Sequence, residues 1–447
     1  MRWAGLLLAT GLLGAGFILA IHNFDSSGLA LGLASVLVGL PLLVRWIHGD
    51  RELNRFLYPI LVWEICLVIF HLLWLVPFYA SAGMDALGYY DAAVQTASSI
   101  RAGDWESVPM SIGNQAVIVP TAILYALFGP SMSAMFGISA MIGLAGVIAF
   151  YKAFAIWQPS GRARLYALVV LFLPSLGVWR SLFGKDSVVI LGLGVACLGY
   201  SKWLARGRFS ALVYTALGVV IAGAVRPHIG FVLVGSLVAT EIWRRNARRG
   251  SFFVKLLLGV VVFAPLLATV GTVAGNYVAL KGQSVDAMLE VGLNNGRGNA
   301  TGGSVLVNPE MGSLLDYVRF LPDAMVRLLF RPFPWEAHNA NAMLATLENV
   351  LLFGFLLRSL KSMGGVLRNV RHHPYFLFSL LMVLELSVMF SLLTNLGLIS
   401  RMKAQIYPFL FTLLLAAPHT ARSAQPAAIR RPALRGWSQP REAMRWV

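Results

Sequence analysis

Long apolar runs separated by short polar connections recur along the whole chain. Residues 57–79, 252–274 and 375–393 are examples of such runs. An α-helix rises about 1.5 Å per residue, so runs of this length match the roughly 30 Å of hydrocarbon in a bilayer. The strands of a membrane barrel would instead alternate apolar and polar residues, and the sequence contains no such segments. The pattern predicts an all-α, polytopic integral membrane protein.

The composition agrees with this prediction. The 447 residues are 58% hydrophobic and 12% charged, and the mean hydropathy is +0.72. These are too few polar residues to cover the surface of a water-soluble fold. The two cysteines, Cys66 and Cys197, lie within apolar runs, which predicts small core residues and excludes a disulfide framework or a cysteine metal site.

Basic residues are concentrated in particular connections between the runs. Of the 36 Lys and Arg residues, 25 fall in clusters that the positive-inside rule assigns to the cytoplasm, which leaves eleven outside. The cytoplasmic set comprises Arg2 and the clusters within 45–55, 152–164, 202–208, 244–255, 358–371 and 422–445. The net charge of +17 therefore indicates topology and contact with anionic lipids, and not nucleic-acid binding.

The parity of crossings requires one apolar segment to stay on the outer side. Thirteen segments can be counted, but thirteen crossings would place the basic cluster at 152–164 outside. We expect residues 114–129, which are short and contain Pro120, to form a re-entrant or interfacial helix on the outer face. About twelve transmembrane helices then remain, with both termini cytoplasmic. Their predicted ranges are 4–21, 28–46, 57–79, 131–151, 165–179, 188–203, 211–225, 229–243, 252–274, 343–360, 375–395 and 403–417.

The predicted organisation is a single transmembrane domain with a short tail. The domain covers residues 1–417 and carries two long outer loops at 80–130 and 275–341. Residues 418–447 are rich in Pro, Ala and Arg, which predicts a disordered, basic cytoplasmic tail.

The first outer loop carries acidic and aromatic residues close together. If residues 85–100 are helical, Asp85 and Tyr89 share one face, and Asp91 lies about 120° away from Asp85. The alternative is a solvated loop whose acids cap short helices.

Four cations lie in tight connections on the outer side. They are Arg180, Lys185, Arg226 and Arg401. Cations on this side are not explained by topology, and coordination of a lipid phosphate would require them. The alternatives are interfacial anchoring and structural ion pairs. His228 lies beside Arg226 and is a further candidate for contacting a ligand, but no metal-site spacing surrounds it.

The second outer loop ends in an aromatic and charged segment, residues 329–338. Aromatic faces beside charged groups often hold sugars, because the ring covers C–H groups while polar side chains bind hydroxyls. Trp335 and Glu336 are the candidates for that role, and membrane-belt aromatics are the alternative.

A few ionisable residues fall within the apolar runs themselves. They are Glu64, His71, Glu348 and Glu385, and they suggest a proton path.

In their order along the chain, several of these motifs resemble those of the GT-C class of polytopic glycosyltransferases. The bacterial exopolysaccharide and O-antigen polymerase-like membrane proteins are the more similar group. The resemblance covers about residues 57–415 and rests on Asp85-Ala86 with Tyr89, Gly129-Pro130-Ser131, Pro174-Ser175 with Lys185-Asp186, Arg226-Pro227, residues 331–336 and Arg401.

The resemblance implies an inner-membrane enzyme whose active site faces the periplasm or outside. Such an enzyme transfers a sugar or oligosaccharide from a polyprenyl phosphate or diphosphate to an acceptor glycan or lipid. An acidic residue in the first outer loop serves as base or metal ligand in that class, and Asp85 is the matching position. The Asp-x-Asp motif of many members is missing here, so no cofactor is expected with certainty, and a divalent metal ion stays an open possibility.

The chemistry of such a transfer fits these residue types. Displacing a phosphate from an anomeric carbon needs stabilisation of negative charge, which arranged Arg and Lys side chains provide. The acceptor hydroxyl must lose its proton to a carboxylate, for which Asp85 is the first candidate and Asp91 the second. Direct displacement inverts the anomeric centre.

Two other functions fit the same pattern. A transporter or flippase of a lipid-linked glycan would also have twelve spans and intramembrane acids, although the two similar halves that would favour it are not found. An O-antigen ligase, or another transferase acting on the same carrier, is the remaining alternative.

Overall fold

The computed structural model describes residues 45–47, 50–79, 84–246, 314–337, 340–369, 373–390, 393 and 396–416. The predicted spans 4–21 and 252–274, most of the span 28–46, most of the loop 275–341 and the tail 418–447 lie outside the described residues.

The described residues form helices and no strands, which confirms the all-α prediction for this part of the chain. The helices before the long gap are α3 (Arg51–Phe70), a π-helical turn (His71–Leu75), α4 (Val76–Tyr79), α5 (Asp85–Arg101), α6 (Gln115–Phe128), α7 (Met132–Ala155), α8 (Ser160–Phe172), α9 (Pro174–Ser181), α10 (Lys185–Arg206), α11 (Phe209–Val225) and α12 (Pro227–Asn246). Those after it are α15 (Leu314–Phe330), a 3₁₀ turn (Pro334–Glu336), α16 (Ala340–Asn369), α17 (Pro374–Phe390) and α18 (Leu396–Leu414).

Three helical stretches are long and apolar enough to cross a membrane: Glu52–Phe78, Met132–Ala155 and Lys185–Arg206. The pair Ser160–Phe172 and Pro174–Ser181 makes a fourth if it counts as one bent span. The apolar helices α6, α11 and α17 are shorter. Association with a membrane is therefore supported, and the count of twelve spans stays a prediction.

The predicted span 165–179 is not one continuous helix in the structure. The chain bends by 57° between α8 and α9. Leu173 is extended, with ψ of 120°, because the ring of Pro174 disfavours helical geometry in the residue before it. Pro174 then starts α9 at a position where its missing N–H costs nothing. The short helix α9 consequently leads into α10 from a different direction.

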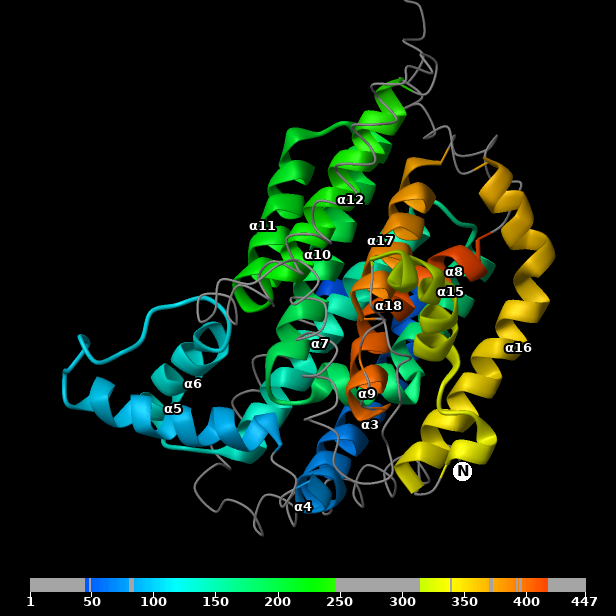
Figure 1. Cartoon of the computed structure of the whole chain (residues 1–447). Coiled ribbons are helices and arrows are strands. Elements are labelled where there is room, and N and C mark those ends of the chain that lie inside the picture. Colours follow the sequence, from blue (N-terminus) through cyan, green and yellow to red (C-terminus); the bar gives the residue numbers. More distant parts are fainter. Residues whose placement is uncertain are drawn as a thin grey trace, which may run out of the picture.

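Helix α10 lies at the centre of the bundle, packed against α7 and α11 (Figure 1). Glycines allow this close approach. A Cβ on Gly218 of α11 would lie 2.3 Å from the backbone nitrogen of Ala196, and one on Gly194 would lie 2.2 Å from the carbonyl oxygen of Gly146 on α7. Such small-residue contacts are typical of helix packing in membranes, where water does not drive association.

Helices α5 and α6 pack on each other and extend sideways from one end of the bundle (Figure 1). A hydrogen bond of 2.7 Å from Gly113 N to Ala224 O joins the start of α6 to the end of α11. The 14-residue α6 ends at Gly129, whose φ of 90° favours glycine. Its re-entrant or interfacial placement stays a prediction, because no membrane is present in the structure.

Two segments that carry basic clusters, and that we expect in the cytoplasm, contact each other: residues 45–55 and residues 152–164. Lys152 Nζ donates to Trp46 O at 2.5 Å, and Arg164 lies 3.9 Å from Glu52. The assignment of these clusters to one side of the membrane is thus compatible with the fold.

Candidate functional site

Four charged residues from separate parts of the chain form one network, which we call the ionic cluster: Asp85, Asp186, Arg226 and Arg401. Arg401 Nε lies 2.5 Å from Asp186 Oδ2, and its Nη1 lies 2.5 Å from Asp85 Oδ2. Arg226 Nη2 lies 2.8 Å from Asp186 Oδ1. The sequence separation between Asp85 and Arg401 is 316 residues, so the fold as a whole assembles this cluster.

Burial divides the ionic cluster into an inner and an outer part. Asp186 is 2% exposed, and the side chains of Arg226 and Arg401 are nearly as buried. The Asp85 side chain is 51% exposed. Asp186 is therefore the inner anchor of both guanidinium groups, while Asp85 forms the accessible rim.

Local sequence places each of these side chains. Gly184 has a φ of 149°, and α10 begins directly after it, so Asp186 lies in the first turn, where the helix dipole favours an anion. Arg226 ends α11, and Pro227 starts α12 at once, which leaves a connection of one residue. Gln405 follows Arg401 by one helical turn and donates to Asp186 Oδ1 at 3.2 Å.

Three further predicted residues lie around the ionic cluster. Lys185 is within electrostatic range of all four members, and His228 is within range of Arg226 and Lys185. The Tyr89 ring passes over Gly184, where a Cβ would lie 3.0 Å from the ring, and packs against Phe183. Burial and the charge of Asp85 raise the pKa of Tyr89 to about 12, so its hydroxyl remains a hydrogen-bond donor at neutral pH.

The structure thus brings together six of the ten predicted site residues and gives the group more cations than anions. Among the described residues, Lys185, Arg226 and Arg401 face the two carboxylates of Asp85 and Asp186. Such an arrangement is suited to binding an anion, since guanidinium groups donate paired hydrogen bonds to phosphate oxygens.

Arg180 does not join the ionic cluster. Its fully buried guanidinium binds Glu64 of α3, with Nη1 to Oε2 at 3.0 Å and Nη2 to Oε1 at 2.5 Å. The bend before α9 directs it there. The predicted contact of Arg180 with a phosphate would require Glu64 to be displaced.

Asp91, Trp335 and Glu336 have no contact with the ionic cluster that the structure describes. Asp91 is exposed on α5. Trp335 is 75% exposed and stacks on Phe333 at a centroid distance of 5.0 Å, and Glu336 binds Arg331 at 2.7 Å. Trp335 and Glu336 therefore lie on a surface separate from the ionic cluster, and their role in sugar binding stays a prediction.

The sequence did not single out Asp186 and Gln405 as site residues. In the sequence, Asp186 enters only through the Lys185-Asp186 motif, on which the resemblance partly rests. Two signals were present: an acid in the first turn after a glycine, and an amide four residues after Arg401. Neither signal identifies the partner in space.

A second polar group lies on the opposite face of α18. Lys403 Nζ donates to Arg331 O at 2.7 Å and to Asn349 Oδ1 at 2.9 Å. Glu348, next to Asn349, accepts hydrogen bonds from the backbone N–H and the hydroxyl of Ser175 on α9. These bonds hold α9, α16 and α18 together and fix the start of the segment that carries Trp335.

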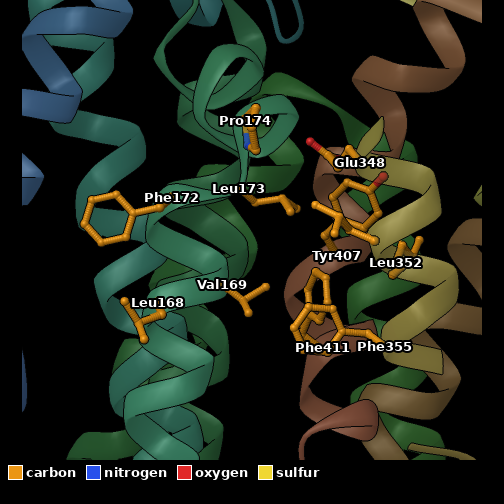
Figure 2. Close-up of a pocket in the computed structure, with 11 residues that line it drawn as sticks. Leu168, Val169, Phe172, Leu173, Pro174, Glu348, Leu352, Phe355, Tyr407 and Phe411 are labelled. Atoms are coloured by element: carbon orange, nitrogen blue, oxygen red, sulfur yellow. The ribbon is translucent and has the colours of Figure 1, made fainter. Parts of the chain in front are cut away.

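Below this group is a cavity of about 180 Å³ between α8, α16 and α18 (Figure 2). Its lining is apolar except for Glu348 and the hydroxyl of Tyr407, which lie at its upper end in Figure 2. Leu351 at its edge is exposed. The cavity and the ionic cluster are separated by α18, so we treat them as distinct features.

Among the described residues, no group of three His, Cys, Asp or Glu side chains could hold a metal ion. Comparisons with protein-family models, with curated proteins and with solved structures find no match to this chain. The resemblance to glycosyltransferases therefore depends on the motifs and on their order along the chain.

Proposed function

We propose that the protein is a membrane glycosyltransferase or polysaccharide polymerase. It transfers a sugar or glycan unit from a polyprenyl phosphate or diphosphate to an acceptor hydroxyl, at the outer face of a bacterial inner membrane. The observation that carries this proposal is the ionic cluster, in which two buried arginines share one buried carboxylate beneath an exposed one.

The phosphate of the donor binds where Asp85 now meets Arg401. An exposed ion pair is weak, whereas a buried and hydrogen-bonded one is costly to break. A phosphate can therefore displace Asp85 from Arg401 while Asp186 continues to hold both guanidinium groups. Lys185 and Arg226 add positive charge on the same side.

The displaced Asp85 then serves as the general base. The acceptor oxygen attacks the anomeric carbon, its proton moves to the Asp85 carboxylate, and the bond between that carbon and the phosphate oxygen breaks. The negative charge that develops on the leaving phosphate is stabilised by Arg226, Arg401 and Lys185. Attack opposite to the leaving group inverts the anomeric centre.

Binding and turnover of purified protein in lipid vesicles test this proposal. Arg226→Gln and Arg401→Gln should each weaken the binding of polyprenyl phosphate about 10- to 100-fold, because each removes a charge-assisted contact. Polyprenol, which lacks the phosphate, should bind equally to all variants. Arg319→Gln, at an exposed arginine of α15, is the matched control.

Transfer is tested separately with a carrier-linked sugar from the source cells. Asp85→Asn should reduce turnover about 10²- to 10⁴-fold, with little change in carrier binding. Asp104→Asn, at an exposed acid of the same loop, should leave turnover unchanged. Loss of turnover in Asp91→Asn but not in Asp85→Asn would move the base to Asp91, and full turnover in both would refute the proposed mechanism.

A further inference from the structure

Glu385 is a buried carboxylic acid without a counter-charge in the part of the chain that the structure describes. It lies on α17 at the interface with α12 and is 6% exposed, and within 45–416 no described residue makes a hydrogen bond of normal geometry to either of its side-chain oxygens. The side chain of Ser236, on α12, lies close enough to interact with the Glu385 carboxyl. The Ser236 hydroxyl also has no hydrogen-bond partner of normal geometry among the described residues. Two unsatisfied polar groups therefore face each other across this interface.

The other buried acids of the described residues all have protein partners. Glu64 binds Arg180, Asp186 binds two arginines, and Glu348 binds Ser175. None of the charged residues that the structure describes acts electrostatically on Glu385.

Several ionisable groups on the helices packed against α17 have partners of their own. Glu241 of α12 binds Arg244, Arg245 and Tyr200, and Asp323 of α15 binds Arg327. On α18, Arg401 lies in the ionic cluster, Lys403 donates to Arg331 O and Asn349, and Tyr407 bonds to Glu348. At the first turns of α12 and α10, His228 and Lys185 lie within electrostatic range of Arg226.

An ionised carboxylate in such surroundings is expensive. Transferring an unpaired charge into an apolar interior costs far more than transferring a neutral polar group, so the group takes up a proton instead. The neutral acid can also donate its O–H to Ser236 after a small rotation, which would satisfy both groups.

We infer that Glu385 is a proton-binding site, at which a neutral carboxyl is buried between α12 and α17. The site goes beyond the proposed glycosyl transfer, in which Glu385 takes no part. Ser236 is ten residues along α12 from Arg226, roughly 15 Å of helix. Helix α12 starts directly after Arg226. A movement of α12 away from α17 would therefore have two effects at once: it would release the proton from Glu385, and it would displace Arg226.

A hydrophobic carbodiimide tests this inference in the intact protein. A carboxylic acid transfers its proton to one carbodiimide nitrogen while its oxygen bonds to the central carbon. The acyl group then moves to nitrogen, so the product is a stable adduct from which nothing has left. An ionised, salt-bridged carboxylate does not add in this way. The adduct is located by peptide mass, as an increase of one carbodiimide molecule.

We expect the adduct on Glu385 and not on Glu64, which is equally inaccessible but paired with Arg180. Its rate should fall about tenfold for each pH unit above the point at which the acid ionises. A water-soluble carbodiimide should not label Glu385. Infrared spectroscopy gives an independent reading, in which the band of a protonated carboxyl should be lost in Glu385→Gln.

Absence of both the adduct and the carboxyl band would overturn the inference. Labelling of Glu64 as fast as Glu385 would overturn it too, since burial alone would then explain the reaction. The inference does not require Glu385→Gln to lose glycosyl transfer. A failure of the inference can therefore be distinguished from a failure of the proposed function.

Discussion

Replacing Asp186 with Asn should destabilise the fold far more than the same change at Asp85. Both residues are acids bound to Arg401 at 2.5 Å, but Asp186 is 2% exposed and also binds Arg226 at 2.8 Å. An amide cannot accept hydrogen bonds at both of its terminal atoms, so Asp186→Asn leaves one buried guanidinium without a carboxylate.

The expected magnitudes follow from burial. Removing one partner of a buried ion pair costs about 3–5 kcal/mol, because the remaining charge is uncompensated. The Asp85 side chain is half exposed, and Arg401 keeps Asp186 as a partner, so the loss expected for Asp85→Asn is about 0–1 kcal/mol. The free energy of unfolding, measured by reversible unfolding in mixed detergent micelles, should separate the two variants by at least about 2 kcal/mol.

A double-mutant cycle measures how strongly Asp186 and Arg226 are coupled. Arg226→Gln removes the charge that Asp186→Asn leaves unpaired, so the double variant should be more stable than the sum of the two single losses predicts. The coupling should be about 0.5–3 kcal/mol. Equal losses for Asp85→Asn and Asp186→Asn, or strict additivity in the cycle, would refute the view that Asp186 anchors the ionic cluster.

Two further predictions concern packing and the aromatic platform. Gly218→Ala should lower the free energy of unfolding by about 1–3 kcal/mol, because the new Cβ would lie 2.3 Å from the backbone of Ala196; Gly354→Ala, which has open space around it, should not destabilise the protein. Trp335→Ala should change the unfolding free energy by less than about 0.5 kcal/mol, because Trp335 is 75% exposed, yet weaken acceptor-glycan binding about tenfold. Calorimetric titration with the acceptor glycan checks the second, and unchanged affinity would exclude Trp335 from sugar binding.

The helical class and the meeting of distant cations were predictable from the sequence for physical reasons. Long apolar runs can satisfy their backbone in a membrane only as helices, and cations outside the basic clusters need an anion. Arg226, Arg401 and Asp85 fulfil that expectation by meeting in the ionic cluster.

The remaining features depend on orientation, which the sequence does not contain. Arg180 and Lys185 are five residues apart in the same connection, yet the bend before α9 turns Arg180 toward Glu64, while Gly184 starts a new helix at Lys185. The sequence also showed no sign that the predicted second outer loop contains helix α15, because the apolar residues of this helix are interrupted by Asp316, Arg319 and Pro322.

The order in which the ionic cluster is assembled has a consequence for biosynthesis. Domains form from the N-terminus as the chain is made, so Asp186 and Arg226, only 40 residues apart, can pair while later helices are still being synthesised. Arg401 follows Asp186 by 215 residues and Asp85 by 316, so its helix arrives long after its partners. Until then the ionic cluster lacks its second guanidinium. If the proposed function is correct, an incompletely made chain would therefore not be able to consume the carrier.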